Sequence, residues 1–215
     1  NFEIIKPKNR LHLYSYEKNF DDFVKMYKYG KLPNAILLSG PKGLGKATFV
    51  YHFVNYLFSD EKQDNYDLNN FSINPNNQSF LHIQNKTHPN FYLLENEFFD
   101  TDIKIEQVRN LKNFLYKSTY LKNVKIVLID DAEKLNINSS NALLKALEEP
   151  SKNTFFFIIF DNFLKIPDTI KSRCLEFKFY LNLTKKKNIF NNLLADFDLN
   201  PNNEVIDKFI QFETP

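Results

Sequence analysis

The stretch SGPKGLGKAT contains three of the chain's four glycines and two lysines, a combination suited to binding a phosphate chain. Its pattern, Gly40-x-x-x-x-Gly45-Lys46, is that of a phosphate-binding loop. The glycines let backbone N–H groups turn towards a β-phosphate, and the lysine brings a positive charge to the β- and γ-phosphates. The expected nucleotide-binding residues are Gly40, Pro41, Lys42, Gly43, Leu44, Gly45, Lys46, Ala47 and Thr48. Lys42 either adds charge towards the phosphates or is solvated, and the sequence leaves both open.

Ala47 departs from the usual pattern. A Ser or Thr normally follows the loop lysine, and its hydroxyl completes the shell of a bound Mg²⁺. Thr48 lies one position further and is rotated by about 100° on the helix, so it does not substitute. We therefore expect the loop to hold ATP or ADP through its backbone and Lys46, with Mg²⁺ bound weakly or not at all.

A pair of acids, Asp130 and Asp131, follows the aliphatic run 126–129. Asp130 has the position of a Walker B acid, which holds Mg²⁺; alternatively, the two acids simply end a strand in solvent. Many ATPases carry Glu at the next position, where it polarises the attacking water. Asp131 is one methylene shorter, and a shift of about 1 Å in a catalytic base can cost on the order of 10²-fold in rate. Hydrolysis is therefore expected to be impaired at two independent places, while Glu133 and Lys134 are expected to be surface charges.

Arg173 is one of only three arginines among the 28 basic residues, so it is a candidate for function. It lies in the tripeptide SRC, just before an expected strand. It could form a local ion pair, or it could be an arginine finger that reaches a neighbouring subunit's γ-phosphate. The residues alone leave both open. Cys174, in an apolar stretch, is expected to be a core residue.

Strands and helices must bring these residues together, and the hydrophobic pattern predicts both. Short apolar runs predict strands at 35–38, 91–94, 126–129, 154–160 and 174–179. Apolar residues at spacings of three and four predict helices at 49–58, 105–115 and 138–150. For the last helix, Ser139 or Ser140 is a candidate N-cap and Pro150 a stop. This alternation indicates an α/β fold, a parallel sheet with helices on both faces.

Two segments differ from this pattern. Residues 60–90 contain eight asparagines without helical period, which predicts an irregular insertion. His82 and His88 lie there without a nearby cysteine, so a metal site is not favoured. From residue 181 onwards the pattern is helical, which predicts the start of a small second domain at 181–215.

Composition sets broad limits. A hydrophobic fraction of 43% and a charged fraction of 25% are those of a globular protein. The net charge of +2 does not indicate a surface that coats nucleic acid, and no apolar run is long enough to span a membrane. We expect a cytoplasmic protein. A single cysteine excludes an internal disulfide and a four-cysteine zinc site, and an initial Asn suggests a trimmed N-terminus.

Five segments together resemble, in order over about residues 10–180, the clamp-loader branch of the AAA+ superfamily, and within it the delta-prime subunits of bacterial DNA polymerase III. These segments are LLSGPKGLGKAT, HPNFYLLE, VKIVLIDDAEKLN, NALLKALEEP and PDTIKSRC. The resemblance implies a RecA-like AAA+ nucleotide-binding domain at 1–180, followed by the beginning of a helical lid domain at 181–215. The family's C-terminal collar domain is absent from this sequence, so we expect an N-terminal fragment.

The resemblance also implies a role. Clamp loaders use ATP to open a sliding clamp and place it on primer–template DNA, as part of a nucleotidyltransferase holoenzyme. A delta-prime subunit is a stationary member of a hetero-pentamer that also contains delta and the motor subunits gamma or tau. Its SRC arginine, here Arg173, would be offered to the ATP of the adjacent motor, while its own ATPase activity would be absent or weak.

An ATP-hydrolysing motor subunit like gamma or tau is the alternative. A motor should keep a hydroxyl after Lys46 and a Glu after Asp130, and this sequence has neither. Motors also usually carry a Thr or Asn that senses the γ-phosphate at the end of the fourth strand, where this chain has Phe160-Asp161-Asn162. Many clamp-loader subunits contain a four-cysteine zinc module, which this chain cannot form.

Overall fold

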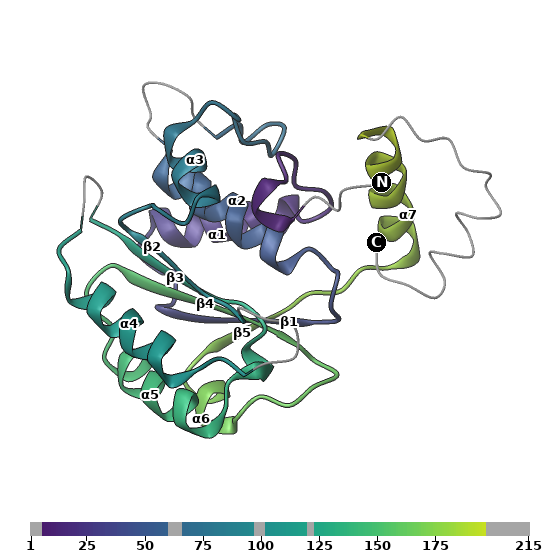
Figure 1. Cartoon of the computed structure of the whole chain (residues 1–215). Coiled ribbons are helices and arrows are strands. Elements are labelled where there is room, and N and C mark those ends of the chain that lie inside the picture. Colours follow the sequence, from purple (N-terminus) through teal and green to yellow (C-terminus); the bar gives the residue numbers. More distant parts are fainter. Residues whose placement is uncertain (1–5, 60–65, 97–101, 120–122, 197–215) are drawn as a thin grey trace.

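The computed structural model describes residues 6–59, 66–96, 102–119 and 123–196. Its centre is a five-stranded sheet of order β2-β3-β4-β1-β5 in which every neighbouring pair is parallel (Figure 1). The strands are β1 (Ala35–Gly40), β2 (Phe91–Leu94), β3 (Lys125–Ile129), β4 (Thr154–Asp161) and β5 (Leu175–Lys178). All five predicted strands are confirmed, with ends that differ by at most two residues.

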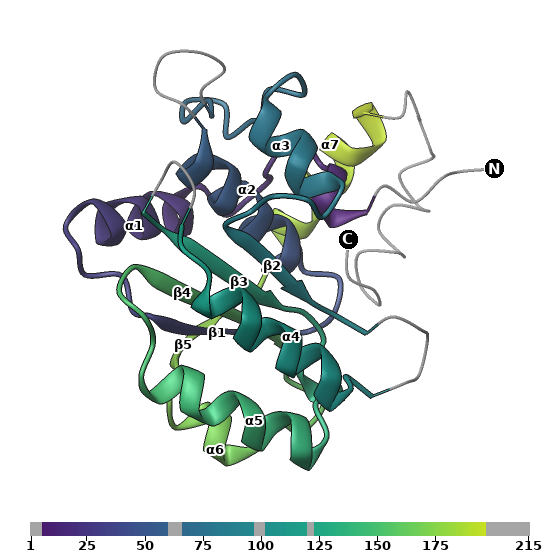
Figure 2. The ribbon, with the colours of Figure 1, turned by 60° about the vertical axis from the view of Figure 1, so that its left-hand side comes forward.

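Helices cover both faces of the sheet. The helices are α1 (Glu17–Lys28), α2 (Lys46–Phe58), α3 (Gln78–Gln84), α4 (Ile105–Tyr116), α5 (Ile137–Glu148), α6 (Asp168–Lys171) and α7 (Leu183–Asp196), with short 3₁₀ turns η1 (Pro7–Asn9) and η2 (Ala132–Lys134). Helices α1, α2 and α3 lie on one face, and α4, α5 and α6 lie on the other (Figures 1 and 2). Helix α7 lies beyond the carboxyl end of β1, apart from both layers. None of the described helices is long and apolar enough to cross a bilayer.

Successive residues of the central strands pack into two different cores. Ile36 and Leu38 pack with α1, α2 and α3, whereas Leu37 between them packs with α4, α5 and α6. All three are fully buried, as expected for a parallel strand covered on both sides. The first core is rich in aromatic rings, with Phe23 and Phe49 packed edge to face at 5.1 Å between centroids. The second core is mainly aliphatic.

The Asn-rich segment is more regular than predicted. The structure describes residues 66–90 of it and places helix α3 at Gln78–Gln84, so the prediction of irregular structure is wrong for those seven residues. Asn77 is the N-cap, and its side chain accepts a hydrogen bond from the backbone N–H of Phe80 at 3.1 Å. Phe80 and Ile83 are buried in the first core. A helix of seven residues is too short for its period to stand out in the sequence.

The N-cap of α5 was also predicted wrongly. It is Asn136, whose Oδ1 accepts a hydrogen bond from the backbone N–H of Ser139 at 2.9 Å. Ser139 lies in the first turn, and its hydroxyl donates to the carbonyl of Ile103. Asn136, Asn138, Ser139 and Ser140 are all competent cap residues, so sequence alone did not separate them. Helix α7 confirms helical structure after residue 181, whereas the rest of the expected helical segment, 197–215, lies outside the described residues.

Candidate functional site

A cavity of about 440 Å³ lies where the carboxyl ends of the central strands meet the loop between β1 and α2. Strand β1 lies between β4 and β5, while the next strand in sequence, β2, is at the far edge. The carboxyl edge of such an open parallel sheet is where ligands bind, at a point where the strand order reverses. The cavity is lined by loop residues 42–48, by Asp130 and Asp131, and by Leu181, Ile189 and Leu193 from the α7 segment. The structure therefore brings together the phosphate loop and the paired acids.

Lys46 is almost completely buried at the base of the loop, with a residue exposure of 5%. Its Nζ donates to the carbonyls of Gly40 at 2.6 Å and Pro41 at 2.7 Å. Burial lowers the pKa of this ammonium group, and the field of nearby acids, Asp161 first and Asp130 next, opposes that change. The amine is thus held inside the loop, where it can exchange a carbonyl for a phosphate oxygen.

Two glycines give the loop its path. Gly45 has φ +79° and is the N-cap of α2, so it directs the chain into the helix. Gly40 has φ +152°, and a Cβ there would come within 2.4 Å of the carbonyl oxygen of Phe179. The backbone after β5 therefore passes directly against Gly40, which leaves no room for a side chain.

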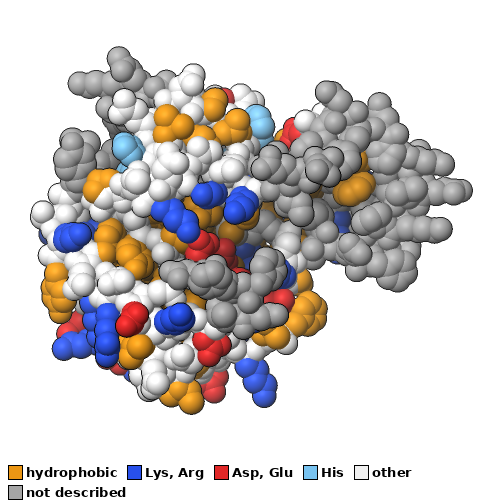
Figure 3. Space-filling view, viewed as in Figure 1, with side chains coloured by type: hydrophobic (Ala, Val, Ile, Leu, Met, Phe, Trp, Pro, Cys, Tyr) orange, Lys and Arg blue, Asp and Glu red, His pale blue; other side chains and the backbone are white. Residues whose placement is uncertain are grey.

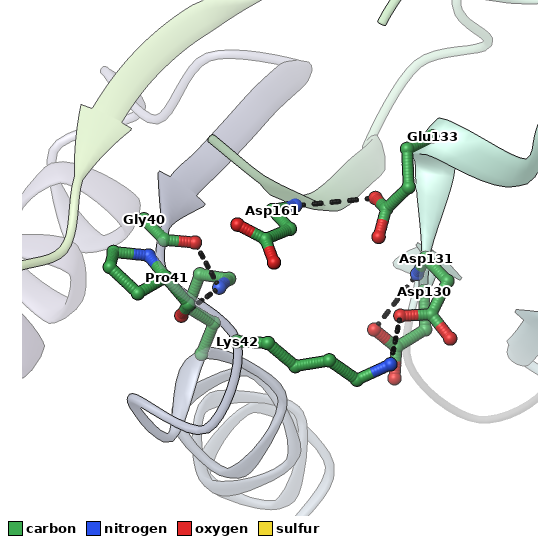
Figure 4. A network of polar contacts seen from close by, with 8 residues as sticks. Gly40, Pro41, Lys42, Asp130, Asp131, Glu133 and Asp161 are labelled. Carbon is green, nitrogen blue, oxygen red and sulfur yellow. Dashed lines mark hydrogen bonds and ion pairs between the residues drawn. The ribbon is translucent and has the colours of Figure 1, made fainter. Parts of the chain in front are cut away.

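Asp130 and Asp131 occupy different environments. Burial raises the pKa of Asp130 to about 6, and the neighbouring charge of Asp131 acts in the same direction. The backbone N–H of Asp131, which has φ +52°, donates to Asp130 Oδ1 at 3.0 Å. The Asp131 carboxylate lies 3.4 Å from the amine of Lys42 (Figure 4). Lys42, for which sequence left two roles open, is thus paired across the cavity mouth and is mostly exposed.

Glu133 and Asp161 also line the cavity, and only the structure places them there. Glu133 Oε2 accepts a hydrogen bond from the backbone N–H of Asp161 at 3.2 Å, across the space between η2 and the end of β4 (Figure 4). Asp161 is the register partner of Gly40, so it stands beside the start of the phosphate loop. Burial raises the pKa of the Glu133 carboxyl. The expectation that Glu133 is a surface charge is wrong, because the turn η2 returns it to the cavity.

The residue that follows Lys46 supplies no ligand for a magnesium ion. Ala47 offers a methyl group to the cavity where a hydroxyl ligand would be needed. Among the described residues, no group of three or more His, Cys, Asp and Glu side chains is placed to hold a metal ion. His82 and His88 have local roles instead: His88 stacks on Phe58 at 4.2 Å, and His82 Nδ1 lies 3.0 Å from Thr87 Oγ1.

Arg173 lies at the amino ends of the strands, whereas the phosphate loop follows the carboxyl end of β1. Strand β5 runs parallel to β1 with Leu175 opposite Ile36, so Arg173 precedes the strand at its amino end. The six residues of β1 separate that edge from the loop, which corresponds to about 20 Å at ~3.3 Å per residue. Its Nε donates to Glu148 Oε1 at 2.7 Å, and Nη1 donates to the Thr169 carbonyl at 2.8 Å. A local ion pair therefore exists, and the guanidinium cannot reach its own chain's loop.

Cys174, next to this arginine, is half-buried and packs against the second core. Burial raises the pKa of its thiol to about 11, so it has little thiolate character at neutral pH. This environment agrees with the packing role expected from the sequence.

Comparison with known proteins identifies the family. The family model described as "DNA polymerase III, delta subunit" matches residues 16–182, which is most of the chain. The chain belongs to this family. It is 34% identical over 143 residues to the DNA polymerase III subunit delta' of Pseudomonas aeruginosa, covering 66% of this chain and 42% of that protein. It is 28% identical over 156 residues to the Escherichia coli subunit delta', covering 73% of this chain and 45% of that protein. The resemblance to the delta-prime subunits is thereby confirmed.

A gamma subunit of DNA polymerase III matches as well. The one from Buchnera aphidicola subsp. Schizaphis graminum is 30% identical over 171 residues, covering 78% of this chain and 43% of that protein. The chain spans less than half the length of each of these three relatives.

Solved structures confirm the RecA-like AAA+ fold. The structure of a RuvB variant from Thermotoga maritima aligns with a TM-score of 0.52 at 16% identity, covering 97% of this chain and 60% of that one. Domain III of the T. maritima replication initiation protein DnaA aligns with a TM-score of 0.50 at 16% identity, covering 95% of this chain and 79% of that one. At this level of identity the likeness concerns the fold alone.

Proposed function

We propose that this chain is a non-motor, delta-prime-like subunit of the DNA polymerase III clamp loader that offers Arg173 to the ATP of an adjacent subunit. The observation that carries the proposal is the position of Arg173 at the amino edge of the sheet, while the phosphate loop is at the carboxyl edge. An arginine so placed acts on a nucleotide only if a second subunit brings one to it. The Arg173 side chain is partly exposed, with 31% of its surface accessible.

The partners follow from the family. They are the motor subunits gamma or tau and the delta subunit in a hetero-pentamer, the sliding clamp, and primer–template DNA held by the whole assembly. On the face shown in Figure 3, basic and acidic side chains are interspersed rather than separated into one basic area. The net charge of +2 supports contact with DNA through the assembly rather than through a strongly basic surface of this chain.

The chain's own loop is proposed to hold a nucleotide without hydrolysing it at a useful rate. Gly45, Lys46 and the N-terminus of α2 supply the phosphate-binding elements. Ala47 removes a metal ligand, and Asp131 is paired with Lys42 rather than placed to activate a water. Nucleotide in this site would then serve assembly or stability.

A motor subunit remains the second candidate, and the 30% identity to a gamma subunit is the observation that favours it. A motor would hydrolyse ATP in its own loop, which requires the groups that Ala47 and Asp131 replace. Steady-state ATP hydrolysis by the full-length protein alone separates the two. Negligible turnover supports the non-motor role, and robust turnover that Lys46→Ala abolishes supports the motor.

The in-trans role is tested in a reconstituted clamp loader in which only this subunit carries Arg173→Ala. We expect assembly to be normal and DNA-stimulated ATP hydrolysis to fall, by as much as ~10³-fold at the affected site. An unchanged rate removes the proposed role of Arg173.

A further inference from the structure

We propose that the cavity at the phosphate loop selects a nucleoside diphosphate over the triphosphate, because Asp161 and Glu133 oppose a third phosphate and Tyr16 offers its hydroxyl to the ligand. This inference rests on the proposed function only in taking the loop as a nucleotide site. It concerns which nucleotide that site holds.

The first observation is an unpartnered hydroxyl. Tyr16 lines the cavity, is 5% exposed, and its OH has no hydrogen-bond partner among the described residues. Its ring packs against Phe49 and Phe179, and an edge atom lies 3.8 Å from where a Cβ of Gly45 would be. A buried hydroxyl without a partner is costly, and a ligand oxygen in the cavity would satisfy it. The hydroxyl therefore indicates that the cavity is built to receive a polar ligand beside the loop.

The second observation is the charge of the cavity lining around the phosphate loop. Four carboxylates line it, from Asp130, Asp131, Glu133 and Asp161. Two lysines line the same part of the cavity, and Lys42 is already paired with Asp131. Of these two lysines, Lys46 remains for phosphate, and its amine is bonded to the carbonyls of Gly40 and Pro41. Arg10 also lines the cavity, from the N-terminal segment.

Asp161 and Glu133 line the cavity beside the start of the phosphate loop. Asp161 is level with Gly40 in the sheet and exerts the strongest favourable field of the neighbouring acids on Lys46. Glu133 Oε2 accepts a hydrogen bond from the Asp161 backbone N–H at 3.2 Å, so the Glu133 carboxylate is held beside Asp161 (Figure 4). A γ-phosphate reaching past Lys46 would meet these negative charges in a partly buried site, where repulsion is screened less than in water. The β-phosphate needs only the loop N–H groups and Lys46.

The apolar end of the cavity fits the rest of such a ligand. Leu181, Ile189 and Leu193 line this end from the α7 segment, opposite the N-terminal residues Leu13 and Tyr14. Tyr14 joins the two sides, because its hydroxyl donates to the Asp196 carboxylate at 3.0 Å. A volume of about 440 Å³ is within the usual range for a small-ligand site.

The test is calorimetric binding of ADP and of ATP to the full-length protein, each in EDTA and in Mg²⁺. We expect ADP to bind at least ~10-fold more tightly than ATP in EDTA. Asp161→Asn and Glu133→Gln should each reduce the ratio of ADP affinity to ATP affinity, because ATP binding becomes stronger. Asp168→Asn, which removes an exposed acid outside the cavity, is the matched control and should leave the ratio unchanged. Tyr16→Phe should weaken both nucleotides without changing the ratio.

Equal affinity for ADP and ATP, or a ratio that neither acid substitution changes, overturns the inference, and so does the absence of binding by both nucleotides. These outcomes leave the in-trans role of Arg173 standing, because that role is measured on the ATP of the neighbouring subunit. Conversely, diphosphate selectivity with no effect of Arg173→Ala would support this inference and reject the proposed function.

Discussion

Glu148 holds the guanidinium of Arg173 at the surface: Arg173 Nε donates to Glu148 Oε1 at 2.7 Å, and a second guanidinium nitrogen donates to the same oxygen. Helix α5, which ends at Glu148, thus supports the residue that precedes β5. An arginine side chain has many rotamers, so a fixed carboxylate reduces the entropy lost when it binds a phosphate. Glu148 is therefore a positioning residue for Arg173 in the proposed role.

Glu148→Gln should lower ATP hydrolysis by the reconstituted assembly about two- to fivefold in kcat. This corresponds to the ~0.4–1 kcal/mol that an exposed charge pair contributes. KM for ATP and the free energy of unfolding should change little. The adjacent exposed acid gives a matched control, since Glu149→Gln should leave kcat unchanged. A higher rate in Glu148→Gln would show instead that the pair withholds Arg173 from the neighbouring site.

Gly40→Ala should destabilise the protein by at least ~3 kcal/mol, because a Cβ would lie 2.4 Å from the Phe179 carbonyl oxygen and φ is +152°. Gly30→Ala is the control. It also has positive φ, +64°, but nothing lies within 4 Å of its Cβ, so only the backbone strain of ~1–2 kcal/mol is expected. Urea unfolding of both variants measures the difference. Equal losses would contradict the close approach of the backbone after β5.

Because of His52, the free energy of unfolding should decrease as the pH falls below 6.5. It is fully buried between the Tyr66 hydroxyl at 2.9 Å and the Arg10 carbonyl at 3.2 Å, and burial lowers its pKa to about 3. Below pH 6.5, His52 takes up a proton in the unfolded chain but stays neutral in the folded chain. The stabilisation present above pH 6.5 is therefore lost as pH falls, by about 2 kcal/mol at pH 5.

Asp130 acts in the opposite direction, because its pKa is raised to about 6 and the folded state gains stability as it protonates. The test therefore compares the pH dependence of stability between the unsubstituted protein and its variants. His52→Gln should be less stable than the unsubstituted protein above pH 6.5, but its stability should decline less between pH 6.5 and 5. His82→Gln, at an exposed histidine, should keep the original slope. Parallel curves for the unsubstituted protein and His52→Gln would contradict a buried neutral His52.

Sequence predicted the parts of the fold that depend on long apolar patterns. The runs that form β1, β3 and β4 are continuous because both faces of each strand are buried, and the phosphate loop was recognised from glycine spacing between a strand and a helix. Helix α3 is too short for that kind of signal, and the N-cap Asn136 was one of several equivalent polar residues.

The other residues that line the cavity could not be predicted, because they are brought there by turns, strand register and packing rather than by a sequence motif. Glu133 reaches the cavity through the turn η2, and Asp161 through its register with Gly40. Tyr16 precedes α1, in a segment without a motif, and only the packing of its ring against Phe179 places it beside the loop. For Arg173, sequence left an ion pair and a finger open, and the structure adds Glu148 and the distance from the loop.

The most direct test of the central claim compares two substitutions in the reconstituted full-length assembly, Arg173→Ala and Lys46→Ala, each made in this subunit alone. DNA-stimulated ATP hydrolysis is measured at matched assembly. The account predicts a large fall for Arg173→Ala, towards the ~10³-fold associated with an arginine finger at the affected site, and little change for Lys46→Ala. The reverse result, loss of hydrolysis with Lys46→Ala and an unchanged rate with Arg173→Ala, would contradict it.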